Sequence, residues 1–508
     1  MPGRGKLTRL AGGIGLATLA SRILGLVRTV LIAKYFGVGV FADAFFIAFQ
    51  IPNVMRRLFG EGGLQAAFIP VFTECMEKDG SSSAWGMASA VTNVLMASLF
   101  IISGLGVLLA PIVTRLLVPG FDAESAAITT DLLRIMFPYI FFIGLATLGM
   151  GILNSLRHFA IPAITPIILN LFMIAALFFF IAPESRTGII ILSVSVILGG
   201  VGQLLIQLPI LRAKGMQFRL IFNHPKIKKL FFLAVPATLG LAIYQINIVV
   251  DRICASFAFI VGEGAISALT YGVWIVQVPI AIFSTAIATA TFPRLAGYAA
   301  KGEIAKLRQM FSFSFRTALT LLIPASAGLI VLRKPIISLL FERGAFDATA
   351  TEITATALLF YSIGLFAYGA VHILSKTFYS LQDMKTPLRA AIVAMVSNVA
   401  LNIILMFPLG LGGLALATSI SAVINMFILV FLLNRRIGGV DGKKILNSLF
   451  KIIPITAIMM FLCHILMGMF ANEVLAVLIP IAAGAAFFIG VSLLLKLEEV
   501  GVMVRRNK

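Results

Sequence analysis

Apolar runs of about twenty residues recur along the whole chain, and they limit the possible folds more than any motif does. A helix of that length crosses a bilayer, and a backbone in hydrocarbon must satisfy its hydrogen bonds within helices or a closed barrel. Of the 508 residues, 60% are hydrophobic and only 12% are charged, which is too few charges for the surface of a soluble domain. The sequence therefore predicts an all-α polytopic membrane protein.

We expect about fourteen membrane spans. Their approximate ranges are 8–36, 41–59, 85–109, 132–153, 161–181, 188–211, 230–257, 265–292, 311–332, 353–378, 388–407, 411–433, 452–470 and 474–495. Residues 60–83 are expected to form a polar connection. The basic start followed by an apolar stretch resembles a signal peptide, but the apolar run resumes after Arg22, which favours a retained first helix.

The net charge is +20, from 40 Lys and Arg against 20 Asp and Glu. In a soluble chain this balance would indicate nucleic-acid binding. Here the cations lie between apolar runs, so no nucleic-acid partner is expected. Most of them, including those of the basic segment 212–229, fall on one side when the N-terminus is cytoplasmic. The positive-inside rule therefore predicts that both termini are cytoplasmic.

The chain contains an internal repeat with an offset of 223–225 residues. The matched positions are Pro70 with Pro293, Pro111 with Pro335, Phe121 with Phe346, and Pro162 with Pro387. Six spans per half make the repeat parallel, because an even number returns the chain to the same side of the membrane. We predict a six-helix lobe over residues 1–225, a second over 226–440, and two additional spans within 441–508.

Two six-helix lobes with a substrate site between them are typical of transporters that work by rocking. The alternative is that the duplication serves only as a scaffold, as in a passive channel or an assembly platform.

The first span carries Arg22 and Arg28, although arginine at mid-membrane costs at least about 2.5 kcal/mol. They lie about nine ångströms apart along the helix axis, on broadly overlapping faces. One alternative is that both snorkel to an interface. We favour a cationic cavity, because guanidinium groups bind phosphate oxygens bidentately and stay charged.

The second span adds Asp43 near its start and Arg56 and Arg57 near its end, followed by Glu61. Asp43 is expected either to orient an arginine or to stabilise the helix N-terminus as an ordinary acid. The two arginines are expected to line the same cavity, with a plain positive-inside role as the alternative. Glu61 could pair with them.

Polar residues also interrupt the apolar runs of the second half. Asp251 and Arg252 lie in the seventh span, and Asn398 and Asn402 share a face of the eleventh, where Thr418 of the twelfth could reach them. One carboxylate with amide and hydroxyl oxygens would suit Na⁺. Hydrogen bonding between helices is the alternative.

No catalytic constellation is apparent in the sequence. The histidines are scattered, the three cysteines are far apart, and there is no phosphate-binding glycine-rich loop for ATP. We therefore expect no enzyme activity, no resident metal and no cofactor, and a driving force from an ion gradient or the membrane potential.

Three stretches carry a resemblance to a known family: ASRILGLVRTVLIAKYFG, DAFFIAFQIPNVMRRLFGEGGLQAAFIPVF and FYSLQDMKTP. They are similar to the bacterial MurJ (MviN) family of lipid II flippases, in the multidrug/oligosaccharidyl-lipid/polysaccharide exporter superfamily. The resemblance covers nearly the whole chain. It implies fourteen helices in the bacterial inner membrane and export of the undecaprenyl-pyrophosphate-linked peptidoglycan precursor by alternating access. Membrane lipids and cell-wall synthesis or division proteins are the implied neighbours.

The resemblance also implies roles for individual residues. Substrate-binding arginines would be Arg22, Arg28 and Arg56, with Asp43 and Glu61 near the gate. A Na⁺ site would comprise the following residues: Asp251, Asn398, Asn402 and Thr418.

One position departs from the family pattern. Members often carry an arginine in the eighth span shortly before a proline, and Trp274 takes that place here, in WIVQVP. Our hypothesis is that Arg252 replaces the missing cation.

Three alternatives remain open at this point. The chain could export another polyprenyl-linked oligosaccharide, could serve as a membrane scaffold for cell-wall enzymes, or could act on the lipid pyrophosphate as an enzyme. A cationic-drug exporter is disfavoured, because its cavity would need carboxylates rather than arginines.

Overall fold

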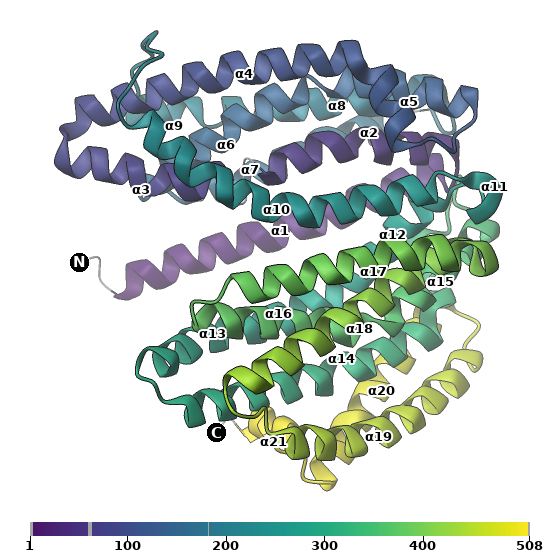
Figure 1. Cartoon of the computed structure of the whole chain (residues 1–508). Helices are drawn as coiled ribbons and strands as arrows, with labels where there is room; N and C mark the ends of the chain where they lie inside the picture. Colours follow the sequence, from purple (N-terminus) through teal and green to yellow (C-terminus); the bar gives the residue numbers. More distant parts are fainter. Residues whose placement is uncertain (1–3, 59–62, 181, 506–508) are drawn as a thin grey trace. The chain divides into compact units, whose positions relative to one another are not determined.

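A computed structural model describes residues 4–58, 63–180 and 182–505, and within these ranges every regular element is a helix. Contacts divide the chain into two compact units (Figure 1). The first comprises Met1–Phe257 with Arg343–Ala345, and the second comprises Ala258–Glu342 with Phe346–Lys508. The all-α polytopic fold class is therefore confirmed.

The first unit contains ten helices within the described residues. They are α1 (Arg4–Phe36), α2 (Val40–Arg57), α3 (Gly63–Lys78), α4 (Gly80–Leu117), α5 (Ala123–Met136), α6 (Tyr139–Ser155), α7 (Ala160–Phe179), α8 (Arg186–Leu205), α9 (Leu208–Ala213) and α10 (Ile227–Ala255). α1 packs against α7, α7 against α8, and α2 against α5, so that α1 and α2 close one side of the group formed by α5 to α8.

The second unit follows the same order and adds two spans. Its elements are α11 (Ala258–Val261), α12 (Ala265–Pro279), the π-helical turn η2 (Ile280–Ser284), α13 (Thr285–Ala300), α14 (Ile304–Phe341), α15 (Ala348–Ile363), α16 (Leu365–Ser380), α17 (Lys385–Leu409), α18 (Leu411–Arg436), α19 (Gly442–Gly468), α20 (Glu473–Leu494) and α21 (Glu498–Arg505). α19 and α20 pack on each other and on α14 (Figure 1).

Eleven helical segments of the described chain are long and apolar enough to cross a membrane, and α15 with α16 makes a twelfth if this bent pair is one span. α2 and α10 are helical but fall outside that count; α2 carries Asp43, Arg56 and Arg57 within 18 residues. They occupy the second and seventh predicted spans. The exact number of fourteen stays a prediction.

The prediction that residues 60–83 form a polar connection is wrong for residues 63–78. These residues form α3, which packs against α4, α6 and α10. Its apolar residues Phe68, Val71, Phe72 and Cys75 are fully buried. They recur at helical spacing, but the polar residues between them made the stretch look like a loop.

The break between α15 and α16 lies at Gly364 and bends the pair by 45°. A Cβ atom at Gly364 would lie 2.7 Å from the Cα of Ser419 in α18. Glycine therefore lets two helix backbones touch at the bend.

The internal repeat is visible in the elements themselves. α4 and α14 each have 38 residues and contain the matched prolines Pro111 and Pro335. α3 and α13 each have 16 residues. Asp122 caps α5 and Asp347 caps α15, each by accepting from the backbone N–H three residues ahead.

The repeat extends to unusual backbone geometry. Arg157 and Gln382 stand 225 positions apart, and both adopt the left-handed region, with φ of 59° and 58°. Non-glycine residues rarely adopt this conformation. Its recurrence at matched positions indicates that both halves inherited the same turn.

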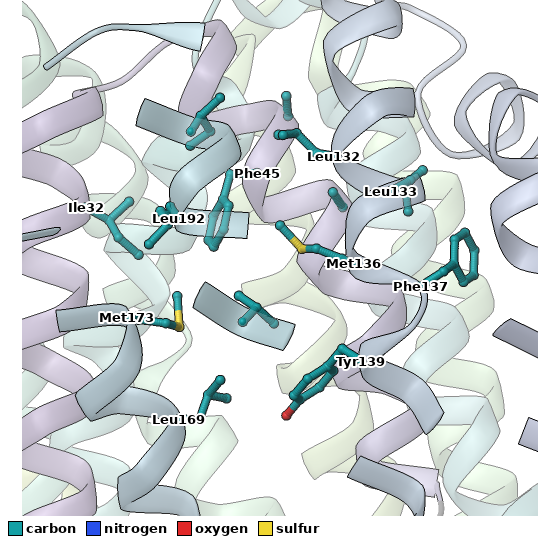
Figure 2. Close-up of a cluster of buried hydrophobic side chains, with 14 of the residues drawn as sticks. Ile32, Phe45, Leu132, Leu133, Met136, Phe137, Tyr139, Leu169, Met173 and Leu192 are labelled. Atoms are coloured by element: carbon teal, nitrogen blue, oxygen red, sulfur yellow. The ribbon is translucent and has the colours of Figure 1, made fainter. Parts of the chain in front are cut away.

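The main core of the first unit lies between α1, α2, α4, α5, α6, α7 and α8. Figure 2 shows its labelled side chains, among them Ile32, Phe45, Met136, Tyr139 and Met173. Most are aliphatic or aromatic without polar atoms. Tyr139 is an exception, because it carries a hydroxyl group into this apolar environment.

The compact units divide after Phe257, whereas the predicted lobes divide at residue 226. The difference concerns α10, which packs against α3 and α4 of the first unit. Its first turn contributes Leu230 to the apolar cluster around Trp85. The lobes 1–225, 226–440 and 441–508 were drawn from the repeat and stay a prediction about its limits.

Candidate functional site

Arg28 lies on the face of α1 that packs against α7. Its Nη1 donates to Asn170 Oδ1 at 3.1 Å and approaches Met173 Sδ at 3.9 Å. The guanidinium also lies 6.0 Å from the centre of the Phe49 ring of α2, at the outer limit of a cation–π contact. Two neighbouring helices, α7 and α2, therefore contact this arginine through neutral groups.

Asn170 positions Arg28 on α1. It is buried, and while its Oδ1 accepts from Arg28, its Nδ2 donates to the carbonyl of Ser21 at 3.2 Å. A single amide of α7 thereby binds both a side chain and a backbone group of α1. Amide hydrogen bonds of this kind fix one helix against another inside a membrane.

No carboxylate among the described residues lies within ion-pair distance of Arg28. The Nε of Arg28 is removed from solvent and has no hydrogen-bond partner in the described chain. A partly buried guanidinium with neutral neighbours keeps most of its binding capacity for an anion.

Arg56 and Tyr139 extend this cationic region. The charge of Arg56 acts on both Arg28 and Tyr139. Arg56 donates from Nε and Nη2 to Asn53 Oδ1, at 3.2 and 3.0 Å, within α2. Arg28, Arg56 and Tyr139 thus lie within electrostatic range of one another, and we call them the cationic cluster of the first unit.

The hydroxyl of Tyr139 belongs to a buried chain of amides. It donates to Gln203 Oε1 at 3.3 Å, and Gln203 Nε2 donates to the carbonyl of Thr165 at 3.1 Å. Gln207 Nε2 donates to the carbonyl of Gln203. These bonds hold α6, α7 and α8 together.

The other residues predicted for substrate binding lie in different surroundings. Arg22 is exposed on α1, and Asp43 is buried in the first part of α2. Arg252 is half-buried in α10. Glu61 lies outside the described residues. Of the six predicted residues, the structure brings Arg28 and Arg56 within electrostatic reach of each other.

Three of the four predicted Na⁺ ligands meet in the second unit. Asn402 Nδ2 donates to Asn398 Oδ1 at 3.1 Å, and Asn398 Nδ2 donates to Thr418 Oγ1 at 3.4 Å. Asn398 and Asn402 are buried in α17. Asp251 belongs to the first unit, and Trp274 to the second.

Asn170, Tyr139 and Gln203 were missed by the sequence reasoning. Asn170 had a usable signal, because it is the only amide within the apolar residues 160–179. Polar residues inside an apolar span are expensive and so indicate a partner. Tyr139 and Gln203 lie inside the apolar segments Ala123–Ser155 and Arg186–Ala213, so the same signal was available for them.

A sequence model described as "Lipid II flippase MurJ" matches residues 32–484. A curated protein of Rhizobium tropici, named "Probable lipid II flippase MurJ", is 37% identical over 430 residues, covering 83% of this chain and 80% of that protein. The chain belongs to the MurJ family. A Burkholderia cenocepacia protein named "Lipid II flippase MurJ" is 33% identical over 427 residues, covering 82% of both.

Solved structures agree with this membership. A structure titled "Lipid II flippase MurJ, inward closed conformation" matches with a TM-score of 0.82 at 30% identity, covering 95% of this chain and 98% of that chain. A multidrug transporter of the MATE family, in the MOP superfamily, matches with a TM-score of 0.68 at 17% identity, over 82% of this chain and 94% of the other. The second likeness concerns the fold of this MurJ-family chain alone.

Proposed function

We propose that this chain translocates lipid II from the inner to the outer leaflet of the bacterial cytoplasmic membrane, for cell wall biosynthesis. Its membership of the MurJ family carries the proposal. The cationic cluster of the first unit supports it, because Arg28 and Arg56 are the group type that binds a pyrophosphate. No covalent bond is made or broken in such a transfer, so the chain acts as a transporter.

Arg28 and Arg56 are proposed to bind the pyrophosphate, with the exposed Arg22 completing the path along α1. Asn170 holds Arg28 ready for this contact. Asp43 and Glu61 are proposed to act at the gate. Arg252 remains our proposed substitute for the cation that the family often carries where Trp274 stands.

A Na⁺ ion is proposed as the coupling ion. The oxygens of Asn398, Asn402 and Thr418 are chemically suited to Na⁺, and the two hydrogen bonds described above join the three residues. Asp251 would supply the carboxylate.

The basic segments between spans support a topology in which both termini are cytoplasmic. Cell-wall synthesis or division proteins are proposed as neighbours of the chain in the membrane. The repeat supports alternating access, because duplicated lobes are the common architecture of rocking transporters.

The experiment is complementation of a bacterium depleted of its own lipid II flippase, together with flipping of labelled lipid II in proteoliposomes. Growth and flipping by the wild type support the proposal. Loss of both by Arg28→Ala, at matched membrane levels, supports the cationic site. A purified, folded protein that flips no lipid II in proteoliposomes and does not rescue growth contradicts the proposed function.

A further inference from the structure

The chain between α9 and α10, residues 214–226, forms an extended segment that we call the strap. Two buried side chains of α4, one helical turn apart, hold its backbone. Ser89 Oγ donates to the carbonyl of Gln217 at 2.8 Å. Asn93 Nδ2 donates to the carbonyls two and four positions further on, at 2.7 and 2.9 Å. Alternate carbonyls of the strap are therefore fixed on α4.

Charges hold the end of the strap. Lys226 Nζ lies 3.0 Å from Asp79 and 3.4 Å from Glu74, and Lys229 Nζ lies 2.6 Å from Glu74. The hydrogen bond from Lys229, together with the charge of Lys226, lowers the pKa of Glu74 to about 2. The strap is thus a fixed part of the first unit.

The side chains at every second position of the strap are large, apolar and exposed. The exposed fractions are 56% for Phe218, 78% for Leu220 and 59% for Phe222. Phe232, in the second turn of α10, is 82% exposed. Exposed apolar groups gathered on one segment indicate a binding surface, and the fixed backbone presents them without further ordering.

Exposed cations surround these apolar side chains in the sequence. They are Arg212, Lys214, Arg219 and Lys228. Apolar residues interleaved with Lys and Arg fit the boundary between acyl chains and anionic headgroups. The strap directly follows the apolar segment Arg186–Ala213, which is long enough to cross the membrane. A lipid surface therefore lies within reach of the strap.

We propose that the strap is a docking surface for anionic phospholipids. Phe218, Leu220 and Phe222 enter the interfacial layer of the leaflet, and the surrounding cations bind lipid phosphate groups. The binding is independent of the lipid that the chain transports, because the strap contains none of the residues proposed for lipid II.

Position in the bilayer provides the first test. Cys75, Cys254 and Cys463 are buried, so a cysteine introduced as Leu220→Cys can be labelled selectively with a nitroxide. In phosphatidylglycerol vesicles we expect the label to collide with oxygen and to be shielded from a water-soluble nickel chelate. A label at Asn223→Cys should stay accessible to the chelate. A label at position 220 that is equally accessible to the chelate in phosphatidylglycerol and phosphatidylcholine vesicles overturns the proposal. Phe222→Cys repeats the measurement at an independent position.

Affinity provides the second test. A fluorophore at position 220 is titrated in detergent with phosphatidylglycerol, phosphatidylcholine or inorganic phosphate, and only the first should shift its emission. Replacing Arg212, Lys214, Arg219 and Lys228 by Gln should weaken binding about fivefold for each cation removed. Lys226 and Lys229 are spared because they hold the strap.

The matched control replaces four exposed cations of the second unit, Lys301, Arg436, Lys443 and Lys496, by Gln. An equal loss of binding in the control overturns the proposal, as does an equal response to inorganic phosphate alone. Shielding of position 220 that requires a soluble protein, and not lipid, assigns the surface to a protein partner and also overturns it.

Discussion

Two arginines, one in each compact unit, lie inside the helical bundles in opposite electrostatic surroundings. Arg316 of α14 is buried and paired with two carboxylates of α21: Nη2 lies 2.9 Å from Glu498, and Nη1 bonds Glu499. Arg28 of α1 has an amide oxygen, a sulfur and an aromatic ring as its neighbours. In the sequence, both residues are arginines within an apolar run, and nothing local distinguishes their surroundings.

The carboxylates around Arg316 explain its structural role. Glu499 is fully buried and also accepts from Ser448 Oγ of α19 at 2.8 Å. The cluster of Arg316, Ser448, Glu498 and Glu499 therefore ties α21 to α14 and α19. A guanidinium whose charge is compensated in this way has little left for a ligand. No carboxylate of the described chain compensates the charge of Arg28. An anion-binding site requires such an uncompensated cation.

Removing one partner of the compensated cluster should give the largest effect on folding. Arg316→Ala leaves Glu499 buried without its cation, and we expect unfolding to become easier by about 3–5 kcal/mol. Denaturant titration in detergent measures this, with the exposed Lys443→Ala as control. Replacing Arg316, Ser448 and Glu499 together by Met, Ala and Leu should recover most of the loss. Unchanged stability of Arg316→Ala would refute the structural role.

Removing the uncompensated arginine should instead reduce transport. We expect Arg28→Ala to slow lipid II flipping about 100-fold, because a charge-assisted contact to phosphate is worth about 3 kcal/mol. Stability should fall by only about 1 kcal/mol, since only neutral contacts are lost. Flipping in proteoliposomes tests this, with Lys34→Ala, an exposed cation at the end of the same helix, as control. Normal flipping by Arg28→Ala would remove the distinction between the two arginines.

Asn170→Asp gives Arg28 the kind of partner that Arg316 has. The new carboxylate should bind the guanidinium in place of the substrate phosphate and slow flipping about tenfold, the equivalent of about 1.4 kcal/mol. Asn170→Ala is the matched control, because it removes the hydrogen bond without adding a charge, and its effect should be smaller. A larger loss in the alanine variant would show that orientation, rather than free charge, limits Arg28.

The smallest effect should come from the solvated pairs of Glu74. The pKa of this carboxyl is lowered from 4.5 to about 2 by Lys229 and Lys226. The contribution to stability is therefore complete above pH 4.5 and is lost as the pH falls towards 2. The difference in Tm between wild type and Glu74→Gln should be small and should vanish over that window. A difference that persists unchanged through it would place the effect elsewhere.

The membrane fold was largely predictable from the sequence. Apolar runs located the spans, and the offset of 223–225 residues predicted a repeat that recurs in paired helix lengths and in the turns at Arg157 and Gln382. The stretch 63–78 was mispredicted because its apolar face is narrow and interrupted by polar residues. The repeat predicted α10 in the second lobe, but α10 belongs to the first compact unit because it packs against α3 and α4.

The sequence by itself determined that this chain is an α-helical membrane protein, because hydrocarbon leaves few other options for its apolar runs. It also placed Arg22, Arg28 and Arg56 within or beside those runs. The tertiary structure decided which charges are compensated, because that depends on neighbours distant in sequence. Asn170 is 142 positions from Arg28, and Glu499 is 183 positions from Arg316. The same holds for the strap. Its apolar and basic residues can be read from the sequence, but its backbone is fixed by Ser89 and Asn93 of α4, which are distant in sequence.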